Sequence, residues 1–276
     1  MSRRAWVEQI MGMPISIHVR AADVGSPAVV HAVEEAFDVL READRLFSTY
    51  QQHSEVSRIR RGELDPALAD PAVRQVIALC QRARELTDGA FTDLMPDEEG
   101  VLRFDPTGLV KGWAADQAAS RLAELPGVSY CLNAGGDVVV GGTVGDTGDT
   151  GDASDTSDSG EARDSGEARD SGEARDSGDE PGAPWRVGIE DPRDRSRIAE
   201  VVVLHEGGVA TSGTAARGAH LYDSATGTFV DRSGSVTVVG PTLMWADVWA
   251  TALFVGPDSL PHLFADAAEG YRSIRL

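Results

Sequence analysis

A low-complexity segment divides the chain into two parts that must build a folded core together. Residues 143–183 contain Gly-Asp-Thr units and then Ser-Gly-Glu-Ala-Arg-Asp, repeated three times from Ser159 to Asp176. They hold thirteen acidic residues against three arginines, so they carry −10 of the chain's net charge of −20. Because the repeats contain no large apolar side chain, burial cannot offset the entropy cost of ordering them. We therefore predict a disordered acidic insertion within a single domain spanning residues 1–276.

The composition of the chain favours a folded protein that does not bind nucleic acid. Hydrophobic residues make up 41% of the sequence, enough to fill a core, and no basic patch or arginine-rich arm appears. Cys80 and Cys131 lie among apolar residues and are predicted to be buried thiols. No run of 18 apolar residues predicts a membrane span, and no signal peptide is visible, so the cytoplasm is the expected location.

The periodicity of apolar residues predicts both helices and strands. Alternation with a period of two predicts a strand at residues 13–19, and β-rich stretches cover 128–132, 137–140, 185–189, 198–204 and 235–239. Helical spacing predicts helices at 26–47, 70–87, 111–125 and 246–254. Hairpin-like strand pairs and long connections favour an α+β fold, with mixed, largely antiparallel sheets and packed helices, over a doubly wound sheet.

Asp247 and Thr251 place a carboxylate and a hydroxyl four residues apart in an apolar run. On a helix this spacing puts both oxygens on one face, one turn apart. The pair suits Mg²⁺, which uses few protein ligands and often also binds substrate phosphates. An N-terminal helix cap, with Asp247 facing the helix dipole, is an equally good interpretation of the spacing alone.

Two small-residue segments are candidates for binding a ligand through backbone amides. Gly135 and Gly136, between Asn133 and Asp137, allow positive φ angles and close approach to a ligand, but glycine pairs are also common in tight hairpin turns. Residues 211–214 offer three hydroxyls and a glycine that could bind phosphate oxygens, and a turn is again the alternative.

Two basic side chains could take part in chemistry. His220 could act as a general base near neutral pH, although a histidine flanked by apolar residues is more often structural. Lys111, just before a glycine at the predicted start of a helix, opposes the helix dipole. An anionic ligand at this helix end would relieve the conflict, whereas the alternative is an exposed lysine on a solvated loop.

Taken in order, the motifs of this chain resemble those of the ApbE-type FAD:protein FMN transferases over about residues 10–255, excluding the insertion. They are Met11-Gly12-Met13, Phe47-Ser48-Thr49-Tyr50, Thr87-Asp88-Gly89-Ala90-Phe91, Val110-Lys111-Gly112-Trp113-Ala114-Ala115-Asp116, Asn133–Asp137, Ala210–Gly213, His220 to Gly227, and Ala246–Thr251. In two places the chain departs from the family pattern. The aspartate in Phe91-Thr92-Asp93 is displaced by one residue, and Asp223-Ser224-Ala225-Thr226-Gly227 lacks a proline.

The resemblance implies Mg²⁺-dependent transfer of the FMN half of FAD to a threonine of a partner flavoprotein, with release of AMP. It implies that Asp247 and Thr251 hold Mg²⁺ with a backbone carbonyl near Val110, and that His220 deprotonates the threonine; Asp247 and His220 are thus the expected catalytic residues. The residues it places along the flavin-nucleotide cleft are Met11, Tyr50, Lys111, Asp116, Gly135, Gly136, Asp137, Thr211, Ser212 and Gly213. The alternatives are an FAD pyrophosphatase that yields FMN and AMP, and a non-catalytic FAD-binding protein.

Overall fold

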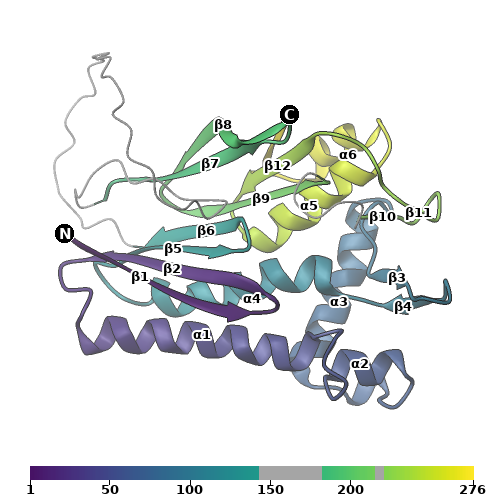
Figure 1. The fold of residues 1–276 in the computed structure, drawn as a ribbon, viewed down its shortest axis with the longest axis horizontal. Helices are drawn as coiled ribbons and strands as arrows, with labels where there is room; N and C mark the ends of the chain where they lie inside the picture. The colour runs from purple at the N-terminus through teal and green to yellow at the C-terminus, as the bar shows by residue number, and fades with distance from the viewer. Residues whose placement is uncertain (143–181, 215–220) are drawn as a thin grey trace.

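The fold is known from a computed structural model that describes residues 1–142, 182–214 and 221–276 (Figure 1). The predicted disorder of residues 143–183 therefore concerns a segment that lies almost wholly outside the described residues, and His220 lies outside them as well. Within the described ranges, the main sheet has seven antiparallel strands in the order β1-β2-β5-β6-β9-β12-β13. These strands are β1 Ser2–Ile10, β2 Met13–Ala21, β5 Ser129–Ala134, β6 Asp137–Gly142, β9 Gly207–Gly213, β12 Ser235–Gly240 and β13 Arg272–Arg275.

The main sheet lies between a layer of helices and a two-stranded ribbon. Helices α1 (Pro27–Phe47), α4 (Thr107–Ala123) and α5 (Leu243–Val255) cover one face, and the ribbon of β7 (Trp185–Asp191) and β8 (Asp194–Leu204) covers the other (Figure 1). Successive side chains of a strand point to opposite faces. Accordingly, Leu132 packs in the helix-side core, while the neighbouring Cys131 packs with Trp185 in the ribbon-side core.

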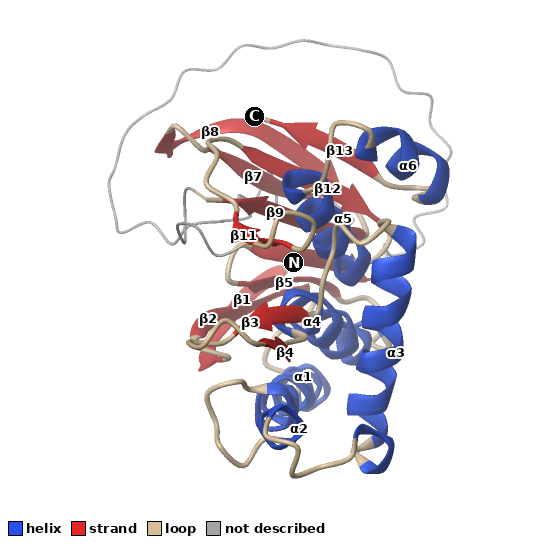
Figure 2. Cartoon of the chain, turned by 90° about the vertical axis from the view of Figure 1, so that its right-hand side faces the viewer, coloured by secondary structure: helices blue, strands red, loops and turns tan. Residues whose placement is uncertain are grey.

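The remaining elements surround one end of the helical layer. Figure 2 shows α3 running roughly perpendicular to α1 and α4, with α2 beside α1. The short strands pair as β3 with β4 and β10 with β11, forming small antiparallel ribbons apart from the main sheet. The bounds are α2 Glu55–Arg60, a 3-10 turn Pro66–Leu68, α3 Pro71–Leu86, β3 Leu94–Pro96, β4 Leu102–Phe104, β10 Tyr222–Asp223, β11 Thr228–Phe229 and α6 Leu260–Ala267.

The predicted α+β class is confirmed, as are several of its elements. Ser26 caps α1 by accepting a hydrogen bond from the backbone N–H of Val29, and Asp70 caps α3 in the same way, as the Ser-Pro and Asp-Pro starts indicate. Cys80 and Cys131 are both buried thiols, as predicted. None of the helices in the described ranges combines the length and hydropathy needed to cross a bilayer.

Two helix starts and one strand differ from prediction, and each difference changes how a candidate residue is interpreted. Helix α4 begins at Thr107 rather than residue 111, because Asp105 Oδ1 accepts hydrogen bonds from Thr107 N (3.1 Å) and Oγ1 (2.6 Å). Lys111 is therefore in the second turn, and the predicted conflict with the helix dipole at the N-terminus is wrong. Helix α5 begins at Leu243 rather than residue 246. Residues 211–213 belong to β9 in the interior of the sheet, so their interpretation as a turn is also wrong.

Candidate active site

One end of the main sheet gathers most of the predicted site residues. Met11 lies in the turn between β1 and β2. The pairing of Ile15 with Ala134 brings the β5–β6 turn beside it, and the pairing of Val138 with Val209 puts the C-terminal end of β9 at the same end of the sheet. Figure 1 shows these three ends on one side of the sheet. The antiparallel topology thus joins segments that are far apart in the sequence.

Gly135 and Gly136 form a tight turn at this end. Both have positive φ angles, 63° and 105°, and Ala134 pairs with Asp137 across them. This arrangement is the two-residue hairpin that glycine pairs favour. The backbone N–H of Gly136 donates a hydrogen bond to Asn133 Oδ1 at 2.8 Å. The hairpin interpretation is therefore confirmed, and the turn leaves both glycines exposed beside the buried Asp137.

The hydroxyl side chains at the end of β9 are held in place from two directions. Thr211 Oγ1 lies 2.8 Å from Thr237 Oγ1 on β12, and Ser212 Oγ lies 2.9 Å from Thr251 Oγ1 on α5. Thr211 and Ser212 point to opposite faces of the sheet, so Ser212 faces the helical layer. Thr237, which is 1% exposed, was not among the predicted site residues, because a threonine in a β-rich stretch carries no sequence signal beyond strand propensity.

Asp247 is not a helix cap. Helix α5 starts four residues before it, and Thr242 occupies the N-cap position. Asp247 lies in the second turn and is 4% exposed, and Thr251 follows one turn later, with its hydroxyl bonded to Ser212. The spacing therefore puts a buried carboxylate and a half-buried hydroxyl one helical turn apart. The cap alternative is wrong, whereas binding of a cation by this pair stays a prediction.

A buried charge cluster connects α4, α5 and β6. The ammonium of Lys111 forms ion pairs with Oδ2 of Asp137 and with Oδ2 of Asp247, the latter at 3.5 Å. The side chains of the two aspartates are only 4% and 6% exposed, and that of Lys111 is 17% exposed. Asp137 Oδ1 also accepts the backbone N–H of Thr211 at 3.0 Å. One cation therefore compensates two buried carboxylates, and Asp137 joins the start of β6 to the end of β9.

Lys111 is also distinctive in the composition of the chain. It is the only lysine of the chain, among 25 lysines and arginines. A lysine ammonium is a compact point charge, whereas an arginine guanidinium is larger and planar. The cluster of Lys111 with two buried aspartates is the one place where this chain uses the smaller cation.

The Asp116 carboxylate lies against the start of α5, and its contact with the nucleotide stays a prediction. Its two carboxylate oxygens accept the backbone N–H groups of Leu243 (3.0 Å) and Met244 (2.9 Å), at the start of α5. Burial raises the pKa of Asp116, and the two backbone hydrogen bonds lower it. The carboxylate thus serves as the missing N-terminal cap of a neighbouring helix, since Thr242 makes no side-chain cap bond.

The other predicted residues occupy different settings. Tyr50 follows α1 and is 95% exposed. Val110 lies in the first turn of α4, and its side chain is buried. In a regular helix its carbonyl oxygen accepts the N–H of residue 114, so a cation there would bind the second lone pair of that oxygen. Met11 has an uncommon positive φ of 54° in its hairpin turn. The predicted base His220 lies outside the described residues.

The donor set near Asp247 fits a hard cation. The predicted ligands are the Asp247 carboxylate, the Thr251 hydroxyl and the Val110 carbonyl, all oxygen donors of the kind that Mg²⁺ prefers. In the described ranges, no group of three or more His, Cys, Asp or Glu residues is arranged to hold a metal ion.

Sequence comparison connects this arrangement with known proteins. A model of the ApbE family matches residues 11–95 and 166–273. The FAD:protein FMN transferase of Escherichia coli (strain K12) is 39% identical over 88 residues, which cover 28% of this chain and 25% of that protein. The FAD:protein FMN transferase of Haemophilus influenzae is 26% identical over an alignment of 305 residues, covering 88% of this chain and 78% of that protein. Thus the match spans about a quarter of the E. coli protein, but most of the H. influenzae one.

Structural comparison extends the likeness to the whole fold. The crystal structure of the ApbE protein from Thermotoga maritima superposes with a TM-score of 0.72. The superposition covers 99% of this chain and 94% of that one, at 20% sequence identity. The α+β arrangement with its central antiparallel sheet is therefore shared over nearly the full length.

Proposed function

Because this chain belongs to the ApbE family, we propose that it is a Mg²⁺-dependent FAD:protein FMN transferase. In the proposed reaction, the hydroxyl oxygen of an acceptor threonine attacks the FMN phosphorus of FAD. The bond from that phosphorus to the bridging oxygen breaks, AMP leaves with the bridging oxygen, and the threonine proton passes to a base. The buried cluster of Lys111, Asp137 and Asp247 beside Thr251 is the observation that supports this proposal.

Asp247, Thr251 and the Val110 carbonyl are the groups proposed to hold Mg²⁺. When bound, the cation would neutralise charge on the pyrophosphate oxygens and so favour departure of AMP. Ser212 orients the Thr251 hydroxyl through a 2.9 Å hydrogen bond, and Lys111 orients the Asp247 carboxylate. The protein thus prepares its oxygen donors through neighbouring side chains, as metal sites generally do.

His220 is proposed as the base that accepts the threonine proton, on the strength of its place in the family motif. General-base assistance contributes about 10²–10⁴-fold in rate, so loss of His220 should slow transfer more than it weakens FAD binding. The residues proposed to contact FAD lie at the end of the sheet, in the loop after α1 or on α4. They are Met11, Tyr50, Lys111, Asp116, Gly135, Gly136, Asp137, Thr211, Ser212 and Gly213.

A direct assay tests this function. Purified protein is incubated with FAD, Mg²⁺ and an acceptor protein that the E. coli relative flavinylates, and AMP release and covalent flavin on the acceptor are both measured. We expect equal amounts of AMP and flavinylated acceptor, and loss of both in Asp247→Ala. Asp266→Ala, the same substitution at an exposed position of α6, serves as the matched control and should behave as wild type.

The same assay separates the alternatives. AMP and free FMN that appear without acceptor would identify a pyrophosphatase, in which water replaces the threonine. Stoichiometric FAD that stays intact for hours with Mg²⁺ and acceptor would identify a non-catalytic FAD-binding protein. AMP release that survives Asp247→Ala would refute the role of Asp247 in the reaction.

A further inference from the structure

Asp116 joins α4 to α5 at the level of the charge cluster. It accepts the N–H groups of Leu243 and Met244, the first two residues of α5. Thr242, which could otherwise cap the helix, instead places its hydroxyl 2.9 Å from the Tyr271 hydroxyl. The start of α5 is therefore fixed by a residue of another helix, and not by its own sequence.

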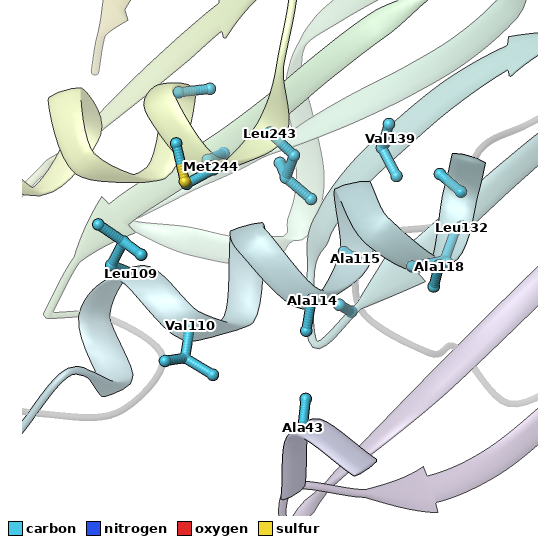
Figure 3. Packing of buried hydrophobic residues seen from close by; sticks show 14 of the residues in the cluster. Ala43, Leu109, Val110, Ala114, Ala115, Ala118, Leu132, Val139, Leu243 and Met244 are labelled. Carbon is cyan, nitrogen blue, oxygen red and sulfur yellow. The ribbon is translucent and has the colours of Figure 1, made fainter. Parts of the chain in front are cut away.

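The two helices also touch closely at this level. A Cβ at Gly112 would lie 2.7 Å from the Cα of Met244, so only glycine allows α4 and α5 to approach this far. Figure 3 shows Leu243 and Met244 lying over α4, whose residues Leu109 to Ala118 run beneath them. The contact at Gly112 sets the distance between the helices, while the two hydrogen bonds from Asp116 set how far α5 slides along α4.

The groups proposed to hold the cation are divided between these same two helices. Val110 and Lys111 precede Asp116 by about one and a half turns of α4, and Asp247 follows Met244 by three residues of α5. A shift of α5 relative to α4 would therefore move Asp247 and Thr251 away from the other donors. Metal sites tolerate little displacement, because ligand distances vary by only about 0.2 Å.

We infer that Asp116 is a positioning residue for the cation site, because it holds the N-terminus of α5 in register with α4. This inference rests on the proposed function, since it concerns the site proposed there. In this role Asp116 acts through the backbone of Leu243 and Met244, whose N–H groups its two carboxylate oxygens accept. The role explains why a carboxylate is buried at this position, where an N-terminal dipole and two N–H groups stabilise its charge.

Binding of Mn²⁺, used as a spectroscopic substitute for Mg²⁺, tests the inference without turnover. Electron paramagnetic resonance of free Mn²⁺ gives the Kd for the wild type, Asp116→Asn and Asp116→Ala, with FAD absent. The asparagine side chain keeps one acceptor oxygen and presents an NH₂ to the second N–H, whereas the alanine side chain removes both acceptors. We expect Mn²⁺ binding about 10-fold weaker in Asp116→Asn and weaker still in Asp116→Ala, the range found for groups that support metal ligands.

Two further variants separate positioning from general loss of stability. Ser129→Ala removes the 2.9 Å hydrogen bond to Trp185 Nε1 on the opposite face of the sheet, and should lower Tm while leaving the Kd for Mn²⁺ within twofold. Gly112→Ala separates α4 from α5 and should weaken Mn²⁺ binding about as much as Asp116→Asn. Asp116→Asn, which keeps one acceptor oxygen, decides the question if Asp116→Ala does not fold.

The outcomes distinguish this inference from the proposed function. If Asp247→Ala abolishes Mn²⁺ binding but a folded Asp116 variant keeps a Kd for Mn²⁺ within twofold of wild type, the positioning role of Asp116 is overturned. If the wild type binds no Mn²⁺, or if Asp247→Ala binds it as the wild type does, the cation site itself is overturned and the positioning role with it. A 10-fold loss in Asp116→Asn, with Ser129→Ala unchanged in Kd, supports the inference.

Discussion

Replacing Lys111 with methionine tests how much the buried charge cluster stabilises the site end of the sheet. Methionine is unbranched and similar in length, so the substitution chiefly removes one positive charge. It leaves Asp137 and Asp247, whose side chains are 4% and 6% exposed, without the cation between them. Because the two carboxylates belong to different elements, their repulsion acts on the contact between β6 and α5.

The magnitude follows from the geometry. At the observed 3.5 Å, the ammonium and Asp247 Oδ2 attract each other by about 5 kcal/mol if the effective dielectric constant is about 20. Desolvation of the ammonium offsets part of this attraction, and removal of one partner from a buried pair typically costs about 3–5 kcal/mol. We therefore expect Lys111→Met to lower the free energy of unfolding by about 3–5 kcal/mol. In a domain of this size, the corresponding fall in Tm is roughly 6–20 °C.

Scanning calorimetry of four proteins measures the effect: wild type, Lys111→Met, Asp137→Asn and the double variant. Asparagine at position 137 keeps an oxygen for the Thr211 N–H but removes the negative charge. The double variant buries one carboxylate fewer than Lys111→Met, so it should be more stable than Lys111→Met alone. A Tm for Lys111→Met within about 2 °C of wild type, or strictly additive effects of the two substitutions, would refute the reasoning.

Three further predictions concern the cation ligand, alkaline stability and the insertion. Thr251→Val should raise the Mg²⁺ concentration needed for half-maximal AMP release at least about 10-fold. In Thr251→Ser, which keeps the hydroxyl, that concentration should stay within about threefold of wild type. Similar Mg²⁺ dependence in the two variants would contradict a ligand role for Thr251. Burial raises the pKa of Tyr130 to about 12, so the stabilisation from its neutral phenol is complete below the unfolded value of about 10 and is lost as pH rises toward 12. Between about pH 10 and 12, the free energy of unfolding measured with urea should therefore fall less for Tyr130→Phe than for wild type. Equal falls in the two proteins would exclude ionisation of Tyr130 as the cause. Deletion of residues 145–182 should leave transfer activity intact, and activity lost without loss of folding would show that the insertion takes part in function.

The α+β class and the principal helices could be predicted from the sequence because local signals determine them. The Ser-Pro and Asp-Pro starts of α1 and α3 place proline in the first turn behind a capping side chain, and apolar spacing marks the buried faces. The motif order identified the family for the same reason, since each motif is a short local pattern. These features do not depend on which distant segments meet.

Pairing of distant segments was harder to predict. Strand β9 contains three glycines, at 207, 208 and 213, and a Thr-Ser pair, a composition typical of turns. It becomes a strand in the interior of the sheet because β6 and β12 pair with it on both sides. At Gly208 an added Cβ would lie 2.5 Å from Leu243, so the glycine reflects the close approach of α5, and not a turn. The contact of Lys111 with Asp137 and Asp247 could not be predicted for the same reason, since it also joins distant segments. The sequence does show that Lys111 is the only lysine of the chain.

The ambiguity of Asp247 shows where local reasoning ends. Its spacing with Thr251 fits a cap or a cation site, and the choice depends on where α5 begins. That boundary is fixed by Asp116, 127 residues before Leu243 in the sequence, which supplies the hydrogen bonds that a local cap would have made. With the helix start capped from α4, Asp247 moves into the second turn and is available to other groups. The hydrogen bonds from Asp116 that replace a local cap therefore also hold Asp247 beside Lys111. A cation site here requires both helices, so it cannot be predicted from the sequence of α5 alone.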